Sequence, residues 1–164
     1  MSETQLYADL AMLGIRFSVH EHAAVFTVDE SAHLHAEIFG THTKNLFLKD
    51  ASGQFWLLTV PHDLRVDLKA LPGVMGSKRL SFGKADDMER LLGVSPGAVT
   101  PLAAINDSAG LVRIVLDTNV SEAVTVNAHP LRNTATIGLS GADLVTALAH
   151  WGHRASVITT PSQL

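Results

Sequence analysis

The spacing of apolar and polar residues alternates along the chain between a helical and a strand-like period. Capping residues and helical spacing of apolar positions predict five helices, over residues 2–14, 27–40, 65–71, 84–93 and 140–152. Alternating or continuous apolar residues predict eight strands, at residues 15–22, two within 44–61, and at 78–82, 111–117, 123–128, 134–139 and 155–159. Helices and strands are therefore interleaved, and no internal repeat, low-complexity tract or linker divides them.

Several strands follow one another through short turns, and this limits the fold class. The two strands within residues 44–61 are joined by a turn that contains Gly53. Strands connected by so short a turn run antiparallel, which argues against a purely parallel, doubly wound sheet. We expect an α/β fold of the α+β kind, with a mixed, mostly antiparallel β-sheet and flanking helices.

Polar residues at the predicted helix starts have side chains that can cap them. Ser2 with Gln5 and Thr27 with Glu30 have the spacing of capping boxes, and Ser140 stands before the last helix. The helix over 65–71 is expected to end at Pro72 and Gly73.

Composition limits the class of protein further. The chain has 164 residues, of which 46% are hydrophobic and 17% charged, as in one globular domain over residues 1–164. No apolar run has the length of a membrane span, and the first residues lack the pattern of a signal peptide. We therefore expect a cytoplasmic protein. Because there is no cysteine, disulfides, thiolate nucleophiles and cysteine zinc sites are excluded.

Charge is unevenly distributed along the sequence. The net charge of −4 argues against a protein that coats nucleic acid nonspecifically. From Lys44 to Arg90, however, eight basic residues outnumber six acidic ones, whereas the remaining residues carry four basic and ten acidic side chains. One surface could therefore meet a phosphate backbone while the rest of the molecule stays acidic.

Common catalytic motifs are missing from the sequence. Nine histidines raise the possibility of a metal site, but there is no H-E-x-x-H motif and no convincingly spaced acidic third ligand. A G-x-S-x-G elbow and a glycine-rich nucleotide loop are also missing. We therefore expect neither a metal nor another cofactor.

Three features remain as candidates for chemistry. Lys44 stands at the start of an apolar strand, although a lysine at such a place is commonly only solvated. The loop from Gly97 to Pro101 contains a glycine that would let a ligand approach the backbone, although it could equally be a plain turn. Pro130 favours an extended backbone at His129, which could present its imidazole or simply pack it.

Several short segments follow one another in a characteristic order. They are "KNLFLKD", "DLRVDLKAL", "KRLSF", "LLGVSPGAVTPLAAIND", "VLD" and "HPLRNTATIGLS". Together they resemble the YbaK/prolyl-tRNA-synthetase-associated editing domains over nearly the whole chain, and most of all the free-standing alanyl-tRNA(Pro) deacylases (ProXp-ala/PrdX). The resemblance implies a mixed sheet curled into a partial barrel. It also implies hydrolysis of the ester that links a wrong amino acid to tRNA(Pro), with help from the terminal ribose hydroxyl.

The resemblance also implies roles for individual residues. Lys44 and His129 match the family's lysine and histidine, and are expected to act in catalysis. Substrate-binding positions are expected at Asn45, Gly97, Ala98, Val99, Thr100, Pro101 and Asn133, and more loosely at the pocket walls Phe26 and Val28. Contacts with the tRNA backbone are expected from Lys49, Lys78, Arg79 and Lys84.

Other functions remain open at this point. The same fold could act on Cys- or Ser-tRNA, because a pocket that differs by one methyl group changes preference by only about 1–3 kcal/mol. A non-catalytic module that binds tRNA or a synthetase is a further alternative. The expected partner is the acceptor end of aminoacyl-tRNA, with prolyl-tRNA synthetase as a second candidate.

Overall fold

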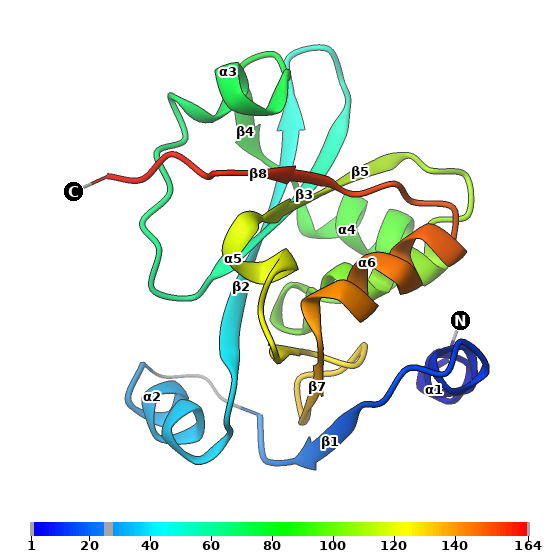
Figure 1. The fold of residues 1–164 in the computed structure, drawn as a ribbon. Coiled ribbons are helices and arrows are strands. Elements are labelled where there is room, and N and C mark those ends of the chain that lie inside the picture. The colour runs from blue at the N-terminus through cyan, green and yellow to red at the C-terminus, as the bar shows by residue number, and fades with distance from the viewer. Residues whose placement is uncertain (1, 25–27, 164) are drawn as a thin grey trace.

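The computed structural model describes residues 2–24 and 28–163, with the backbone alone at residues 28, 29 and 31. Eight strands form one mixed sheet in the order β1-β7-β6-β2-β3-β5-β8, with β4 paired to β2 (Figure 1). Their bounds are β1 Ser18–Glu21, β2 Thr41–Asp50, β3 Phe55–Pro61, β4 Leu80–Phe82, β5 Val112–Asp117, β6 Val126–Ala128, β7 Ala135–Leu139 and β8 Ser156–Ile158. The predicted mixed sheet is confirmed, with antiparallel pairs only a little more numerous than parallel ones.

Strand β2 is the longest strand and belongs to both halves of the sheet. Its first two residues pair in parallel with β6, as Thr41 lies opposite Val126. From Thr43 onward it pairs antiparallel with β3. Side chains near this transition therefore lie between the two halves of the curved sheet. No pairing among the described strands joins β1 to β8, so the sheet stays open as a partial barrel.

Helices cover the sheet and its ends. The α-helices are α1 Glu3–Met12, α2 Val28–Glu37, α3 Leu71–Met75, α4 Ala85–Leu92, α5 Thr118–Ser121 and α6 Gly141–His150, and two 3₁₀ helices are η1 Pro96–Ala98 and η2 Pro101–Asn106. Helix α2 lies at the lower end of β2, far from α3, which lies beside the β2–β3 hairpin (Figure 1).

The caps of the first and last long helices are confirmed. The hydroxyl of Ser2 accepts a hydrogen bond from the N–H of Gln5, and that of Ser140 accepts one from Asp143. Gln5 itself donates to Asp9, so the first capping box is only half formed. The proposed box at Thr27 lies outside the described residues.

The prediction of a helix over residues 65–71 is wrong. The helix in this part of the chain is α3, which begins only at Leu71. The Asp67 carboxylate accepts hydrogen bonds from the N–H groups of Lys69 and Ala70, which forms a turn in place of a helix. Pro72 lies in the first turn of α3, where a missing N–H costs nothing.

Both faces of the sheet are apolar because side chains alternate along its central strands. On β3, Leu57 faces a large core that includes residues of α4, α6 and η2. Its neighbours Trp56 and Leu58 face a smaller core with Leu71 at the start of α3. Within the described residues, no helix is both long and apolar enough to span a bilayer.

Candidate functional site

A cavity of about 600 Å³ opens between α2, the first half of β2, the loop at η1 and the segment from β6 to β7. It is lined by residues that are far apart in the sequence: Ala32, Leu34, His35, His42, Thr43, Lys44, Asn45, His62, Pro96, Gly97, Val99, Asn127, Ala128, His129, Asn133 and Thr136. Six of the predicted site residues are therefore brought together, which are Lys44, Asn45, Gly97, Val99, His129 and Asn133.

Lys44 and Asn45 enter the cavity from β2. Lys44 is half-buried, and its ammonium makes no ion pair with any residue that the structure describes. Asn45 accepts a hydrogen bond from the Thr59 hydroxyl at 2.6 Å and donates one to the carbonyl oxygen of Val99 at 3.1 Å. Asn45 thus attaches the loop at η1 to the sheet, while Lys44 presents an uncompensated positive charge.

The loop from Gly97 to Pro101 contributes only part of its residues to the cavity. Gly97 and Val99 line it, and a Cβ atom on Gly97 would lie 3.3 Å from Nδ2 of Asn133. Glycine therefore permits a close approach between this loop and the turn that carries Asn133. Ala98, Thr100 and Pro101 are buried behind the cavity wall and do not line it.

Thr100 has a structural position instead. Its hydroxyl accepts a hydrogen bond from the N–H of Leu102 and caps η2. The motif spacing could not separate the loop residues that face the cavity from those that support it, because a 3₁₀ turn at each end sets their directions.

His129 is held as an uncharged imidazole. Its Nδ1 donates a hydrogen bond to the carbonyl oxygen of Ala135 at 3.3 Å, which leaves Nε2 as an acceptor. Burial lowers the pKa of His129; the bond to Ala135 opposes this effect, and the nearby His22 adds to it. At neutral pH the ring can therefore accept a proton or a hydrogen bond.

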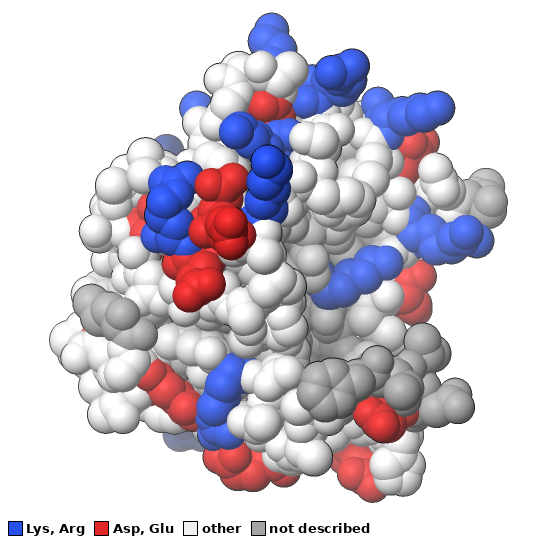
Figure 2. Space-filling model, turned by 180° about the vertical axis from the view of Figure 1, so that it is seen from behind, with Lys and Arg blue, Asp and Glu red and all other residues white. Residues whose placement is uncertain are grey.

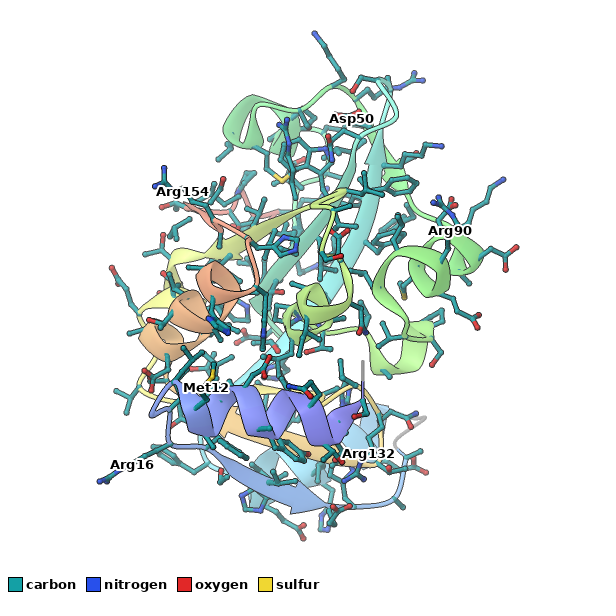
Figure 3. All side chains as sticks on the ribbon, turned by 90° about the vertical axis from the view of Figure 1, so that its right-hand side faces the viewer. Met12, Arg16, Asp50, Arg90, Arg132 and Arg154 are labelled. Carbon is teal, nitrogen blue, oxygen red and sulfur yellow. The ribbon has the colours of Figure 1, made fainter. Side chains whose placement is uncertain are left out.

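Arg132 fixes the turn between His129 and Asn133. Its guanidinium donates to Glu3 on α1 at 2.7 Å and to Glu21 on β1 at 2.6 Å. Figure 3 shows Arg132 near the start of α1. Hydrogen bonding to Arg132 lowers the pKa of both carboxyl groups. Sequence reasoning assigned no role to Arg132, whose partners come from two distant segments.

The four basic residues expected at the tRNA backbone lie outside the cavity. Lys49, Lys78, Arg79 and Lys84 are all exposed. The Lys49 ammonium lies 5.3 Å from the centre of the Phe55 ring, near the β2–β3 hairpin. Figure 2 shows most of the visible Lys and Arg side chains in the upper half of that face, level with this hairpin. We call these four exposed residues the outer basic residues, and none of them lines the cavity.

The two expected pocket walls fall outside what the structure describes. Phe26 lies outside the described residues. Val28 is the first residue of α2, but its side chain also lies outside the description.

Three histidines of the cavity were not predicted as site residues. His35 on α2 stacks on His42 of β2 with 4.0 Å between ring centres, and meets His62 edge-on at 4.4 Å. Burial, together with His42 and His62, lowers the pKa of His35 to about 4. Among the described residues, no group of three or more His, Asp or Glu side chains is arranged to hold a metal ion. The one signal in the sequence was the placement of His42 two residues before Lys44 on the same strand face.

Comparison with known proteins identifies the family of the chain. The family model described as an aminoacyl-tRNA editing domain matches residues 22–147. The chain is 38% identical to the prolyl-tRNA editing protein ProX of Acetoanaerobium sticklandii over 138 residues, covering 84% of each chain. It is 42% identical to prolyl-tRNA synthetase associated domain-containing protein 1 of Bos taurus over 149 residues, covering 88% of this chain and 86% of the relative.

Solved structures share the fold. The hypothetical protein APE2540 superposes with a TM-score of 0.73 at 20% identity, covering 96% of this chain and 99% of the other. A candidate trans-editing enzyme for prolyl tRNA synthetase superposes with a TM-score of 0.71 at 21% identity, covering 98% and 99%. The resemblance noted in the sequence is thereby confirmed: the chain belongs to the aminoacyl-tRNA editing domain family.

Proposed function

We propose that this protein hydrolyses the ester of mischarged tRNA(Pro), with Ala-tRNA(Pro) as its substrate. One observation carries the proposal. Lys44, Gly97 and His129, which are distant in the sequence, line a single cavity together with Asn45 and Asn133. This set offers a cation, main-chain groups, an uncharged imidazole and two amides around one space. Family membership supports editing chemistry at that place.

The proposed mechanism needs no protein nucleophile. An aminoacyl ester is already activated, so hydrolysis requires a positioned water, stabilisation of the developing oxyanion and a fixed ester. The terminal ribose hydroxyl of the tRNA would assist the water. Lys44 would offset the negative charge, and the main chain at Gly97 and Val99 would fix the aminoacyl group. His129, with Nε2 unprotonated, would orient the substrate through a hydrogen bond.

If proline is excluded by size, the exclusion must occur in one part of the cavity. The whole cavity, at about 600 Å³, is larger than a prolyl group requires, so its total volume does not exclude proline. We propose that this exclusion occurs where the Gly97 loop comes close to the Asn133 turn, because a Cβ atom on Gly97 would already lie 3.3 Å from Nδ2 of Asn133. Alanine and serine would be separated less sharply there, because an apolar pocket rejects an added hydroxyl only weakly.

The proposal is tested by measuring deacylation of Ala-, Cys-, Ser- and Pro-tRNA(Pro) and of Ala-tRNA(Ala). We expect Ala-tRNA(Pro) to be hydrolysed fastest and Pro-tRNA(Pro) at least roughly tenfold more slowly. Preference for Cys- or Ser-tRNA(Pro) would keep the chemistry and change the substrate. If none of them is hydrolysed, the protein would instead be a module that binds tRNA or prolyl-tRNA synthetase. The names of relatives are the reason for considering this alternative.

A further inference from the structure

The cavity contains a second group of residues that the proposed hydrolysis does not use. His35 lies on α2, His42 on β2 and His62 directly after β3, and all three line the cavity that Lys44 enters. We infer that this imidazole cluster is the binding site for the terminal adenine of the tRNA, with His62 as the ring that receives the base. The inference rests on the proposed function, and names the part of the substrate that occupies this end of the cavity.

The separation between the histidine cluster and Lys44 is similar to the length of one nucleoside. His42 and Lys44 are two residues apart on β2, so their side chains leave the same face of the strand. Two residues of a strand span about 6.8 Å, which is the scale of a single ribonucleoside. If the ester is held beside Lys44, the adenine on the same terminal ribose can reach the histidine rings.

The size of the cavity agrees with this division. A volume of about 600 Å³ is within the range of sites for whole small molecules and cofactors, whereas an alanyl group fills only a small part of it. The remaining space needs an occupant that belongs to the same substrate. The terminal nucleoside is the group directly attached to the ester.

The chemistry of the rings suits a nucleobase. Unpaired bases are commonly held by stacking on aromatic side chains, histidine among them. The ring of His62 is exposed, whereas His35 and His42 are stacked on each other. An exposed ring at the edge of a preformed stack is where a further flat group can be added.

In His42 and His62, a hydrogen bond to a carbonyl oxygen determines which ring nitrogen carries the proton. Nδ1 of His62 donates to the carbonyl oxygen of His42, and Nε2 of His42 donates to that of Ile38. Nε2 of an uncharged His62 is then an acceptor, and no described residue occupies it. Because this nitrogen accepts in the plane of the ring, it leaves the ring face available for stacking of the base.

Docking of α2 is the competing explanation for the cluster. The stacking of His35 on His42 does attach α2 to β2. His62 lies outside that stack and meets His35 edge-on, and a solely structural role would not require an exposed third ring. The two explanations differ in whether replacing His62 changes the response to the base itself.

The test uses two alanylated RNA microhelices that differ only at the 3′-terminal residue. One ends in adenosine, and the other ends in a ribose that has both hydroxyls but no base. We expect the wild-type protein to hydrolyse the adenosine form roughly tenfold faster, measured as kcat/KM, which is the contribution of one base–aromatic stack. His62→Ala should reduce this ratio to near one, and His62→Phe should retain most of it.

His33→Ala serves as the matched control, because His33 is an exposed histidine on α2 outside the cavity. It should keep the wild-type ratio. An equal loss on both RNAs in His62→Ala, or a wild-type protein that does not distinguish them, would overturn the inference and leave the deacylase intact. Failure of the wild-type protein to hydrolyse either RNA would overturn the proposed function together with it.

Discussion

Asn45 shows how one side chain determines the geometry of the cavity. Its amide joins Thr59 of β3 to the carbonyl oxygen of Val99, so the loop that lines the cavity is held by the sheet. Thr59 is fully buried, and its hydroxyl would lose this acceptor if Asn45 were truncated. Buried polar groups without partners are costly, so the pair is sensitive to substitution.

Asn45→Ala should therefore lower stability and activity together. We expect a loss of about 1–3 kcal/mol in the free energy of unfolding. We expect a fall of roughly 10²-fold in the rate of ester hydrolysis, since the loop would no longer be fixed. Asn45→Asp separates the effects, because a carboxylate still accepts from Thr59 but cannot donate to Val99. Wild-type activity in Asn45→Asp would contradict the view that attachment of the loop matters.

At the same scale, the sequence was sufficient to predict Lys44, Gly97 and His129 as neighbours, because the order of motifs implied a known arrangement. It was not sufficient for Ala98 and Thr100, which are buried and do not line the cavity. Their directions depend on backbone turns that residue types alone do not determine. The histidine cluster was missed for another reason: His42 and His62 meet only because β2 pairs with β3.

Among the elements, α2 has an unusual attachment to the rest of the protein. None of its described side chains is buried, whereas Ile38, directly after the helix, is buried. Two contacts connect the C-terminal end of α2 to β2. They are the ring stack of His35 on His42 and the hydrogen bond from His42 to the carbonyl oxygen of Ile38. This arrangement favours an uncharged His35, because burial and two neighbouring imidazoles lower its pKa.

Acid should therefore release α2. The pKa of His35 in the docked helix is about 4, below its ordinary value of 6.5, so the docked state binds fewer protons than the released state. Docking is at full strength above pH 6.5 and weakens as the pH falls from there towards 4. Hydrogen-exchange protection factors of the α2 amides should fall over this range, while those of α6 should not.

His35→Phe provides the control, since phenylalanine retains a stacking ring that does not titrate. In this variant the protection of α2 should stay constant across the same range of pH. Equal loss of protection in wild type and His35→Phe would show that another group controls the helix.

The helix predicted over 65–71 illustrates what sequence patterns leave undetermined at the level of elements. Apolar spacing in that segment fits a helix, but Asp67 bonds to the backbone immediately ahead and begins a turn. Long periodic elements such as α4 and α6 were predicted well because a whole apolar face supports each of them.

At the scale of the whole molecule, the outer basic residues lie apart from the cavity. The basic residues Lys49, Lys78, Arg79 and Lys84 are exposed and lie outside the cavity, whereas acidic groups such as Glu3 and Glu21 are paired with Arg132. Uneven charge could be predicted from the sequence, but its position relative to the cavity could not. We propose that an acceptor stem leaving the cavity contacts the outer basic residues.

Hydrolysis should accordingly slow as salt is added. If acceptor-stem phosphates bind the outer basic residues, the logarithm of kcat/KM falls linearly with the logarithm of salt concentration. Replacing both Lys78 and Arg79 with Gln should reduce the slope by about 0.9 for each phosphate that is no longer neutralised. Arg16→Gln is the control, because Arg16 lies at the opposite end of the molecule from Asp50, whose carboxylate accepts the Lys78 N–H (Figure 3). An unchanged slope in the double variant would show that Lys78 and Arg79 do not contact the phosphates of the acceptor stem.

The most direct test of the central claim is the single-turnover rate of Ala-tRNA(Pro) hydrolysis by Lys44→Ala, compared with wild type and with Lys49→Ala at saturating protein. Both lysines are on β2, but only Lys44 enters the cavity. We expect Lys44→Ala to lose at least about 10²-fold in rate with an unchanged fold. Lys49→Ala should stay within about fivefold of wild type. Comparable rates for Lys44→Ala and wild type would contradict the assignment of ester hydrolysis to this cavity.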